Sequence, residues 1–328
     1  MAFNLKFWNT RAEATFDPDT NVVRVEVPCS SSVYEPKAGT YFYLMVVDQA
    51  NFWESHPFTL AGVAQGSSSR SGTGEETPLL SPMGSVEEEG RELVQQTSSP
   101  GQRGDDKHMV FLIRPYDDFT LRLRDRAAAW WPKAANPRVL VDGPYGHTRP
   151  LHRFSRVVFV VGGSGIVVPL SYLRSGKSSS QRMYRDVRVH WSVREPALAR
   201  DVLSRDLEGL DCCENIDVSV YLTGASSSSG FELPQEEQAT DAQDGECKMK
   251  KRCLDRRLNA SDAIRDAAAD LEDEDEVKNG GSGSTASLAI VACGPAKMAD
   301  EARRAAGEIM GRMRGRVRVE YFEESFQW

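Results

Sequence analysis

Residues 157–166 read VVFVVGGSGI, an apolar run that passes directly into a glycine-rich turn. The run has the length and composition of a buried strand, and the glycines let the following backbone approach a charged ligand closely. A helix after the turn would meet that charge with its free N–H groups and the positive end of its dipole. Strand, turn and helix in this order are typical of a pyrophosphate site, although a merely structural turn has the same composition.

The rest of the second half continues this pattern. A helical stretch at 296–310 and other helical segments alternate with short apolar runs at 187–193, 216–222, 288–292 and 317–322. Right-handed crossovers place such helices on both faces of a parallel sheet. Residues 151–328 are therefore predicted to form a Rossmann-like, nucleotide-binding domain with a parallel sheet.

The first half has a different period. Val23, Val25 and Val27 alternate with charged residues, which is the period of a half-buried strand. Further β-rich runs, separated by Pro, Gly and Asp, lie at 41–47, 109–114 and 138–141. They predict an antiparallel β-barrel over residues 1–150, so the predicted fold class is β-barrel plus α/β.

Two polar stretches interrupt these domains, at about 66–106 and 225–284. Their Ser, Gly and Glu content buries too little apolar surface to offset the entropy of an ordered chain. We expect both to be disordered inserts, with a short helix at about 261–271 as the one exception.

Composition excludes several classes of protein. A net charge of −8 and a pI near 5.3 oppose binding to a nucleic-acid backbone. The six cysteines form no CxxC pair and have no histidine at metal-ligand spacing, so no metal site is expected. The sequence shows neither a signal peptide nor an apolar run of membrane-spanning length.

Seven short motifs, taken together, carry a family resemblance. The motifs are GTYFYL (39–44), HPFT (56–59), Phe119 with Thr120, DGPYG (142–146), GGSGI (162–166), CGP (293–295) and EESFQW (323–328). With these motifs in this order, the chain resembles the ferredoxin-NADP reductase superfamily, in particular the FAD- and NADPH-binding dehydrogenase domain of fungal ferric-chelate reductases and NADPH oxidases. They span nearly all of the part predicted to fold.

The resemblance makes the barrel an FAD-binding domain and assigns roles within the HPFT motif. It implies that His56, followed by Pro57, contacts the phosphates or ribose of FAD. Phe58 would lie along the flavin, and the Thr59 hydroxyl would hydrogen-bond near flavin N5. A buried flavin needs this combination of apolar cover and a few aimed polar groups.

A second FAD contact is implied at Thr120, which would cap a helix whose N-terminal amides hold the pyrophosphate. Relatives have glycine just before the Phe-Thr pair, whereas this chain has Asp117 and Asp118. Two carboxylates would repel the pyrophosphate unless they point outward. Arg114 can supply the compensating charge, and an exposed arginine at a strand end is the alternative.

On the nucleotide side, the resemblance assigns NADPH binding to the turn Gly162, Gly163, Ser164, Gly165 and Ile166. A threonine common in relatives after this motif is replaced here by Val167. At the end of the second parallel strand, Arg194 favours a 2′-phosphate and therefore NADPH. Glu195 beside it favours NADH.

The remaining implied contacts lie around the nicotinamide. Cys293, followed by Gly294 and Pro295, would sit beside nicotinamide C4, and a buried structural thiol is the alternative. A C-terminal aromatic, Phe326 or Trp328, would stack on the flavin and move aside for the nicotinamide. Of these residues and the HPFT motif, Thr59, Cys293 and Phe326 are the predicted catalytic residues.

The resemblance implies a flavin-dependent oxidoreductase that transfers a hydride from NADPH to FAD and then passes single electrons to an acceptor. In relatives that acceptor is a haem-containing membrane domain, with the dehydrogenase on the cytoplasmic side and ferric or cupric chelates reduced at the end. A superoxide-producing NADPH oxidase module is one alternative. Another is a degenerate, non-catalytic binding module, suggested by Asp118 and Val167.

Overall fold

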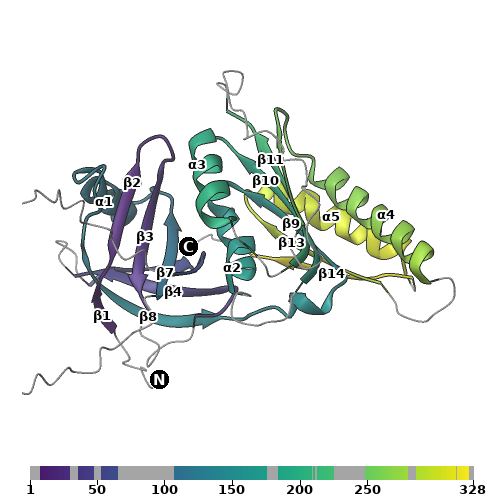
Figure 1. The fold of residues 1–328 in the computed structure, drawn as a ribbon, viewed down its shortest axis with the longest axis horizontal. Helices are drawn as coiled ribbons and strands as arrows, with labels where there is room; N and C mark the ends of the chain where they lie inside the picture. Colours follow the sequence, from purple (N-terminus) through teal and green to yellow (C-terminus); the bar gives the residue numbers. More distant parts are fainter. Residues whose placement is uncertain are drawn as a thin grey trace, which may run out of the picture.

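The structure is a computed structural model and describes residues 8–29, 36–47, 53–65, 107–175, 184–208, 210, 213–224, 248–279, 286–314 and 316–324. Strands fall into two groups along the chain. Those up to Gly146 are antiparallel, and those from Arg156 onward form a parallel sheet. We call these the antiparallel part and the parallel part; they lie side by side in Figure 1.

The antiparallel part contains two four-stranded sheets. One has the order β1 (Trp8–Arg11), β8 (Arg138–Gly146), β4 (Thr40–Val46) and β5 (Ser55–Thr59). The other has the order β2 (Glu13–Asp17), β3 (Val22–Pro28), β7 (Lys107–Ile113) and β6 (Gly62–Gln65). Alternate residues of both sheets meet in one buried core, which helix α1 (Asp118–Ala128) completes with Phe119 and Leu123.

The parallel part is a single six-stranded sheet. Its order is β12 (Lys248–Leu254), β11 (Cys213–Leu222), β10 (Tyr184–Val193), β9 (Arg156–Gly162), β13 (Ser287–Cys293) and β14 (Arg318–Glu323). The order runs outward in one direction from β9 to β12 and in the other from β13 to β14. The chain therefore reverses direction across the sheet between β9 and β13, which makes this pair the topological switch point.

Successive residues of β9 face opposite sides of the sheet, and each side has its own helices. Val157 and Phe159 pack with α2 (Val167–Ser175) and α3 (Pro196–Asp201), which continues as a π-helical turn η4 (Val202–Asp206). Val158 and Val160 pack with α4 (Ala260–Asn279) and α5 (Ala296–Arg312). Figure 1 shows α2 and α3 on the side of the sheet that faces the antiparallel part.

Between the two parts the core is continuous. Val22, Ala61 and Leu112 of the antiparallel part belong to the same buried cluster as α2 and the central strands of the parallel sheet. Two backbone amides also donate across the seam: Gly39 N–H to Ser171 Oγ at 3.1 Å and Arg149 N–H to Tyr172 Oη at 3.1 Å. The two parts are thus held against each other by apolar packing and by directional bonds.

The predicted fold class is confirmed, with antiparallel sheets first and a helix-covered parallel sheet after them. The expectation of disorder across 225–284 is wrong for 248–254 and 272–279, where the structure has β12 and the last part of α4. The short helix expected at about 261–271 is confirmed as part of α4, where Ile264, Ala267 and Leu271 form a buried stripe. β12 is an edge strand rich in Lys and Arg, which are common on edge strands and made this segment read as a polar insert.

The other insert, at 66–106, lies outside the described residues. Among the described helices, none is both long enough and apolar enough to cross a membrane.

Candidate functional site

The predicted pyrophosphate turn lies at the topological switch point. Gly162 ends β9, a short 3₁₀ turn η2 spans Gly163–Ile166, and α2 begins at Val167. Gly163 has φ +53°, a conformation that most side chains disfavour, so glycine is favoured there. Its carbonyl accepts a hydrogen bond from the buried Trp191 Nε1 at 2.8 Å. The strand, turn and helix therefore occur in the predicted order, and Trp191 anchors the turn.

The second predicted motif of the parallel part, Cys293 to Pro295, packs directly on this turn. A Cβ on Gly165 would lie 2.6 Å from the Cys293 carbonyl oxygen, and one on Gly162 would lie 2.8 Å from Pro295 Cδ. Contacts this short exclude any side chain at either position. The structure thus brings the GGSGI and CGP motifs into close contact. Gly163 and Ser164, between the two packed glycines, are half-buried and begin the turn that leads into α2, which is where the pyrophosphate of a dinucleotide would bind.

Cys293 ends β13 and is 2% exposed. Burial raises the pKa of its thiol far above the ordinary value, and the negative charge of Glu324 raises it further. The thiol is therefore protonated at neutral pH and is not a nucleophile. Its location at the C-terminal edge of the sheet agrees with a place beside a bound ligand, and any role there is one of packing.

Arg114 connects the two parts at this point. It follows β7 of the antiparallel part, and its Nη2 donates to Glu195 Oε1 of the parallel part at 2.6 Å. Its Nη1 lies 3.3 Å from the point where a Cβ on Gly163 would stand. A guanidinium group of the antiparallel part thus reaches the glycine turn of the parallel part, where it can meet a phosphate.

Glu195 is the N-cap residue of α3, but its side chain makes no capping hydrogen bond. Its Oε2 is buried and has no hydrogen-bond partner among the described residues. A buried carboxylate oxygen without a partner is costly and fits a donor from a ligand or water. Arg194, which directly precedes it at the end of β10, is exposed. Arg114 therefore balances the charge of Glu195, while Arg194 remains open to solvent.

The HPFT motif forms strand β5, and all four residues are half-buried. His56 stacks on Phe119 of α1, with ring centroids 4.6 Å apart, and Phe58 stacks on the same ring at 6.1 Å. Since side chains alternate along a strand, Pro57 and Thr59 belong to the opposite face, where Thr59 pairs with Tyr41 of β4. The structure therefore brings His56 and Phe58 together with α1 and separates them from Thr59.

His56 lies between two carboxylates. Its Nε2 is 3.1 Å from Glu54 Oε1 and its Nδ1 is 3.3 Å from Asp117 Oδ2. The hydrogen bond from His56 lowers the pKa of Glu54, as does the charge of its other partner, Arg122. These ionic neighbours were not foreseen, and only the short spacing of Glu54 from His56 offered a signal.

The prediction that Thr120 caps α1 is wrong. Asp117 is the N-cap residue and Thr120 is the third helical residue, and the two side chains form a reciprocal capping box. Asp117 Oδ1 accepts the Thr120 N–H at 2.8 Å, and Thr120 Oγ1 accepts the Asp117 N–H at 3.0 Å. An aspartate outcompetes threonine here because its carboxylate also suits the positive end of the helix dipole. The Thr120 amide is consequently already occupied.

Phe326 and Trp328, the predicted stacking aromatics, lie outside the described residues. Within the described part of the chain, no group of three or more His, Cys, Asp or Glu side chains is placed to hold a metal ion.

Comparison with known proteins identifies two domains. A family model described as an FAD-binding domain matches residues 8–69, and one described as a ferric reductase NAD binding domain matches residues 154–307. Ferric reductase transmembrane component 4 of Saccharomyces cerevisiae is 24% identical over 334 residues, which cover 94% of this chain and 40% of that protein. Component 5 of the same yeast is 26% identical over 206 residues, covering 62% of this chain and 24% of that protein.

This chain accordingly spans well under half the length of the curated relatives it matches. Among solved structures, a ferredoxin NADP+ reductase from Neisseria gonorrhoeae with bound FAD and NADP superimposes with a TM-score of 0.47 and 13% identity. That match covers 95% of this chain and 98% of the other.

Proposed function

We propose that this chain, an NAD(P)H-dependent flavin oxidoreductase, takes a hydride from NADPH onto FAD and releases the electrons singly. The premise is the pair of matches to an FAD-binding domain and a ferric reductase NAD binding domain. The observation that carries the proposal is Arg114. This residue belongs to the antiparallel part yet lies over the glycine turn of the parallel part. A phosphate-binding guanidinium of one part and the phosphate-binding turn of the other therefore lie together at the seam. Hydride transfer between two dinucleotides requires that both be bound close together.

On the nucleotide side, the backbone from Gly162 to Ile166 would hold the NADPH pyrophosphate, and Cys293 to Pro295 would bound the nicotinamide. Gly162 and Gly165 support this assignment because their close packing on Cys293 and Pro295 places both motifs together at the C-terminal edge of the sheet. On the flavin side, His56 and Phe58 would hold FAD along β5 and α1. Thr59 would act from the end of β5, two residues before Ala61, which belongs to the buried cluster at the seam.

The chain's own residues bind, orient and shield, since the flavin, when bound, supplies the chemistry of accepting a hydride and giving up single electrons. Arg114 would offset phosphate charge near Asp117 and Asp118. The protonated Cys293 would exclude water from the transfer site without exchanging a proton. A C-terminal aromatic, Phe326 or Trp328, would cover the flavin until the nicotinamide arrives.

NADPH is the preferred donor in this proposal. Arg114 binds Oε1 of Glu195 at 2.6 Å and balances its charge, and only Oε2 is left for a ribose hydroxyl, which is the feature that favours NADH. Arg194 is exposed at the end of the second strand of the sheet, where an arginine can hold a 2′-phosphate.

The acceptor would be a haem-containing membrane domain, with the chain on the cytoplasmic side and ferric or cupric chelates reduced beyond it. This part of the proposal rests on the names of the yeast relatives, which are ferric reductase transmembrane components.

The test is anaerobic mixing of FAD-loaded protein with NADPH, followed by addition of ferricyanide as a one-electron acceptor. We expect the oxidised-flavin absorbance to bleach and then to return as ferricyanide is consumed, with NADPH far more effective than NADH. Protein that cannot be loaded with FAD, or whose flavin does not bleach, would overturn the proposal.

A further inference from the structure

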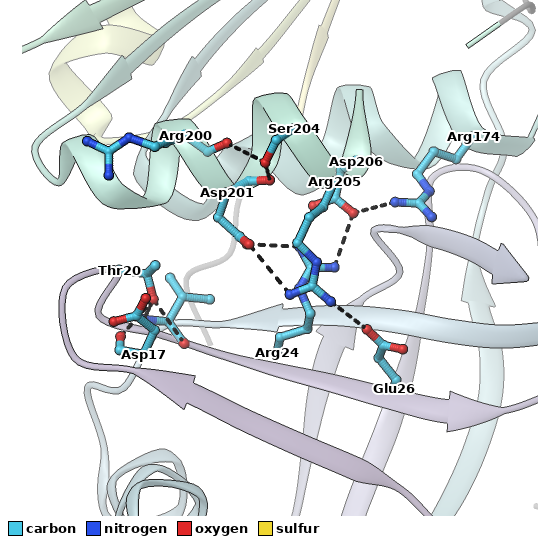
Figure 2. A network of polar contacts seen from close by, with 11 residues as sticks. Asp17, Thr20, Arg24, Glu26, Arg174, Arg200, Asp201, Ser204, Arg205 and Asp206 are labelled. Atoms are coloured by element: carbon cyan, nitrogen blue, oxygen red, sulfur yellow. Dashed lines mark hydrogen bonds and ion pairs between the residues drawn. The ribbon is translucent and has the colours of Figure 1, made fainter. Parts of the chain in front are cut away.

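A group of ionic side chains crosses the seam away from the glycine turn. Arg24 comes from β3 of the antiparallel part, whereas Arg174 comes from α2 and Asp206 from η4 of the parallel part. Figure 2 shows Arg24 directed from its strand toward the helix that carries Asp201 and Asp206. We call Arg24, Arg174 and Asp206 the seam network.

Asp206 is the centre of this network. Arg24 approaches it with both terminal nitrogens, one of them 3.1 Å from Asp206 Oδ1 and the other directed to Oδ2. Arg174 donates to the same Oδ1. One carboxylate therefore binds two guanidinium groups from different elements, and the paired contact from Arg24 fixes direction as well as distance.

The network is buried. Arg24 and Asp206 are 6% and 2% exposed. Burial of Arg24 opposes its positive charge, but the hydrogen bonds and charges of Asp206 and Asp201 outweigh this, and the pKa of Arg24 is raised above its ordinary value. Burial lowers the pKa of Arg174, against the opposing charge of Asp206. The contacts with Asp206 therefore offset the cost of burying the two guanidinium groups.

The apolar contacts of the seam do not specify an angle by themselves, since hydrophobic burial is non-directional and packed elements can slide. Gly62 of β6 brings the two parts close enough for the network to form, because a Cβ there would lie 2.8 Å from Arg174 Cβ. Around the network, Arg24 also contacts Asp201 at 3.1 Å, and Arg205 contacts Glu26 at 3.4 Å. These directional contacts join β3 to the α3–η4 helix.

We propose that Asp206, Arg24 and Arg174 are positioning residues that fix the angle between the FAD-binding and nucleotide-binding parts, and so set the rate of hydride transfer. The inference rests on the proposed function. Its physical reason is that β5 lies on one side of the seam and the glycine turn on the other. A rotation at the seam therefore changes the distance between the two bound rings, while β5 and the glycine turn each keep their own internal geometry.

A charge-matched set of variants tests this. Asp206→Asn keeps the shape of the central side chain but removes its negative charge. Arg24→Lys keeps the positive charge at that position but removes the paired contact with Asp206. Glu308→Gln is the control, since Glu308 pairs with Arg265 between α4 and α5, is exposed and lies away from the seam. The measurement is the limiting rate of flavin reduction per bound FAD at saturating NADPH, together with FAD occupancy and NADP+ affinity.

We expect the limiting rate to fall roughly tenfold to a hundredfold for Asp206→Asn, since a displacement of about 1 Å is enough to do so. Arg24→Lys should lower it less, and FAD occupancy and NADP+ affinity should hold in both. If Asp206→Asn does not fold, Arg24→Lys carries the test. Limiting rates equal to those of wild type and Glu308→Gln, or a loss that follows FAD occupancy alone, would overturn the inference. A wild-type protein that NADPH does not reduce would instead overturn the proposed function.

Discussion

Two ionic contacts cross the same seam and differ in how they are built. The Arg24–Asp206 side chains are 7% and 1% exposed, and the carboxylate is fully engaged. The Arg114–Glu195 side chains are 34% and 19% exposed, with a single contact and one carboxylate oxygen left without a partner among the described residues. The first is suited to hold a fixed geometry. The second is suited to exchange its partner for a ligand, because it loses less when it opens.

Breaking the buried contact should have the largest effect. Asp206→Asn removes the carboxylate that both buried arginines contact and leaves Arg24 with Asp201, and removing one partner of a buried ion pair costs about 3 to 5 kcal/mol. Chemical denaturation should show that loss in the free energy of unfolding. The exposed-pair variant Glu308→Gln should lose less than about 1 kcal/mol. Equal losses in the two variants would mean that burial does not distinguish the pairs.

The flavin side should be the next most sensitive. His56→Ala combined with Thr59→Ala removes charge-assisted and neutral hydrogen bonds with a summed cost of roughly 2 to 4 kcal/mol. FAD affinity should fall by more than about tenfold, as measured by titration of the apoprotein. Full flavin occupancy in this double variant would contradict the assignment of the HPFT motif to FAD binding. The antiparallel side of the seam would then have no assigned flavin contact in β5.

Arg194 tests the nucleotide side. Arg194→Ala should raise the KM for NADPH far more than that for NADH, because a contact between arginine and a 2′-phosphate contributes roughly 1.5 to 3 kcal/mol. Steady-state reduction of ferricyanide with each donor measures this. A matched rise with both donors would make Arg194 a structural residue.

The open contact should show the smallest effect on stability. Arg114→Met should lower the free energy of unfolding by less than about 1 kcal/mol, since the pair is partly solvated. It should nevertheless weaken the binding of a dinucleotide phosphate by about tenfold. Unfolding and binding titrations on one preparation separate the two. A stability loss as large as that of Asp206→Asn would erase the distinction between the contacts.

How much of the fold and of the site could be predicted depends on how far apart in the sequence the contacting residues lie. The glycine turn and the parallel strands follow from local composition, because strand, turn and helix are contiguous from Val157 onward. Asp206 gave no signal, since its partner Arg24 is 182 residues away and each is an ordinary charged residue in its local context. The N-cap of α1 was predicted at Thr120, three residues after its actual position at Asp117, because both side chains can cap a helix.

β12 and the part of α4 beyond the predicted 261–271 were missed for a related reason. Their polar residues dominate the composition, whereas their partners, β11 and the apolar side of α5, are recognised only in the fold. A pattern of buried positions cannot be separated from a solvated run until the surface that covers it is known. The same limit applied to Trp191, whose hydrogen bond to Gly163 joins strand β10 to the glycine turn η2.

The most direct measurement of the central claim is single-turnover reduction of the FAD-loaded chain by NADPH and by NADPH deuterated at nicotinamide C4, under anaerobic conditions. The account predicts that flavin bleaching is complete and slower with the deuterated donor, because hydride transfer across the seam limits the rate. Flavin that stays oxidised in the presence of excess NADPH would contradict it.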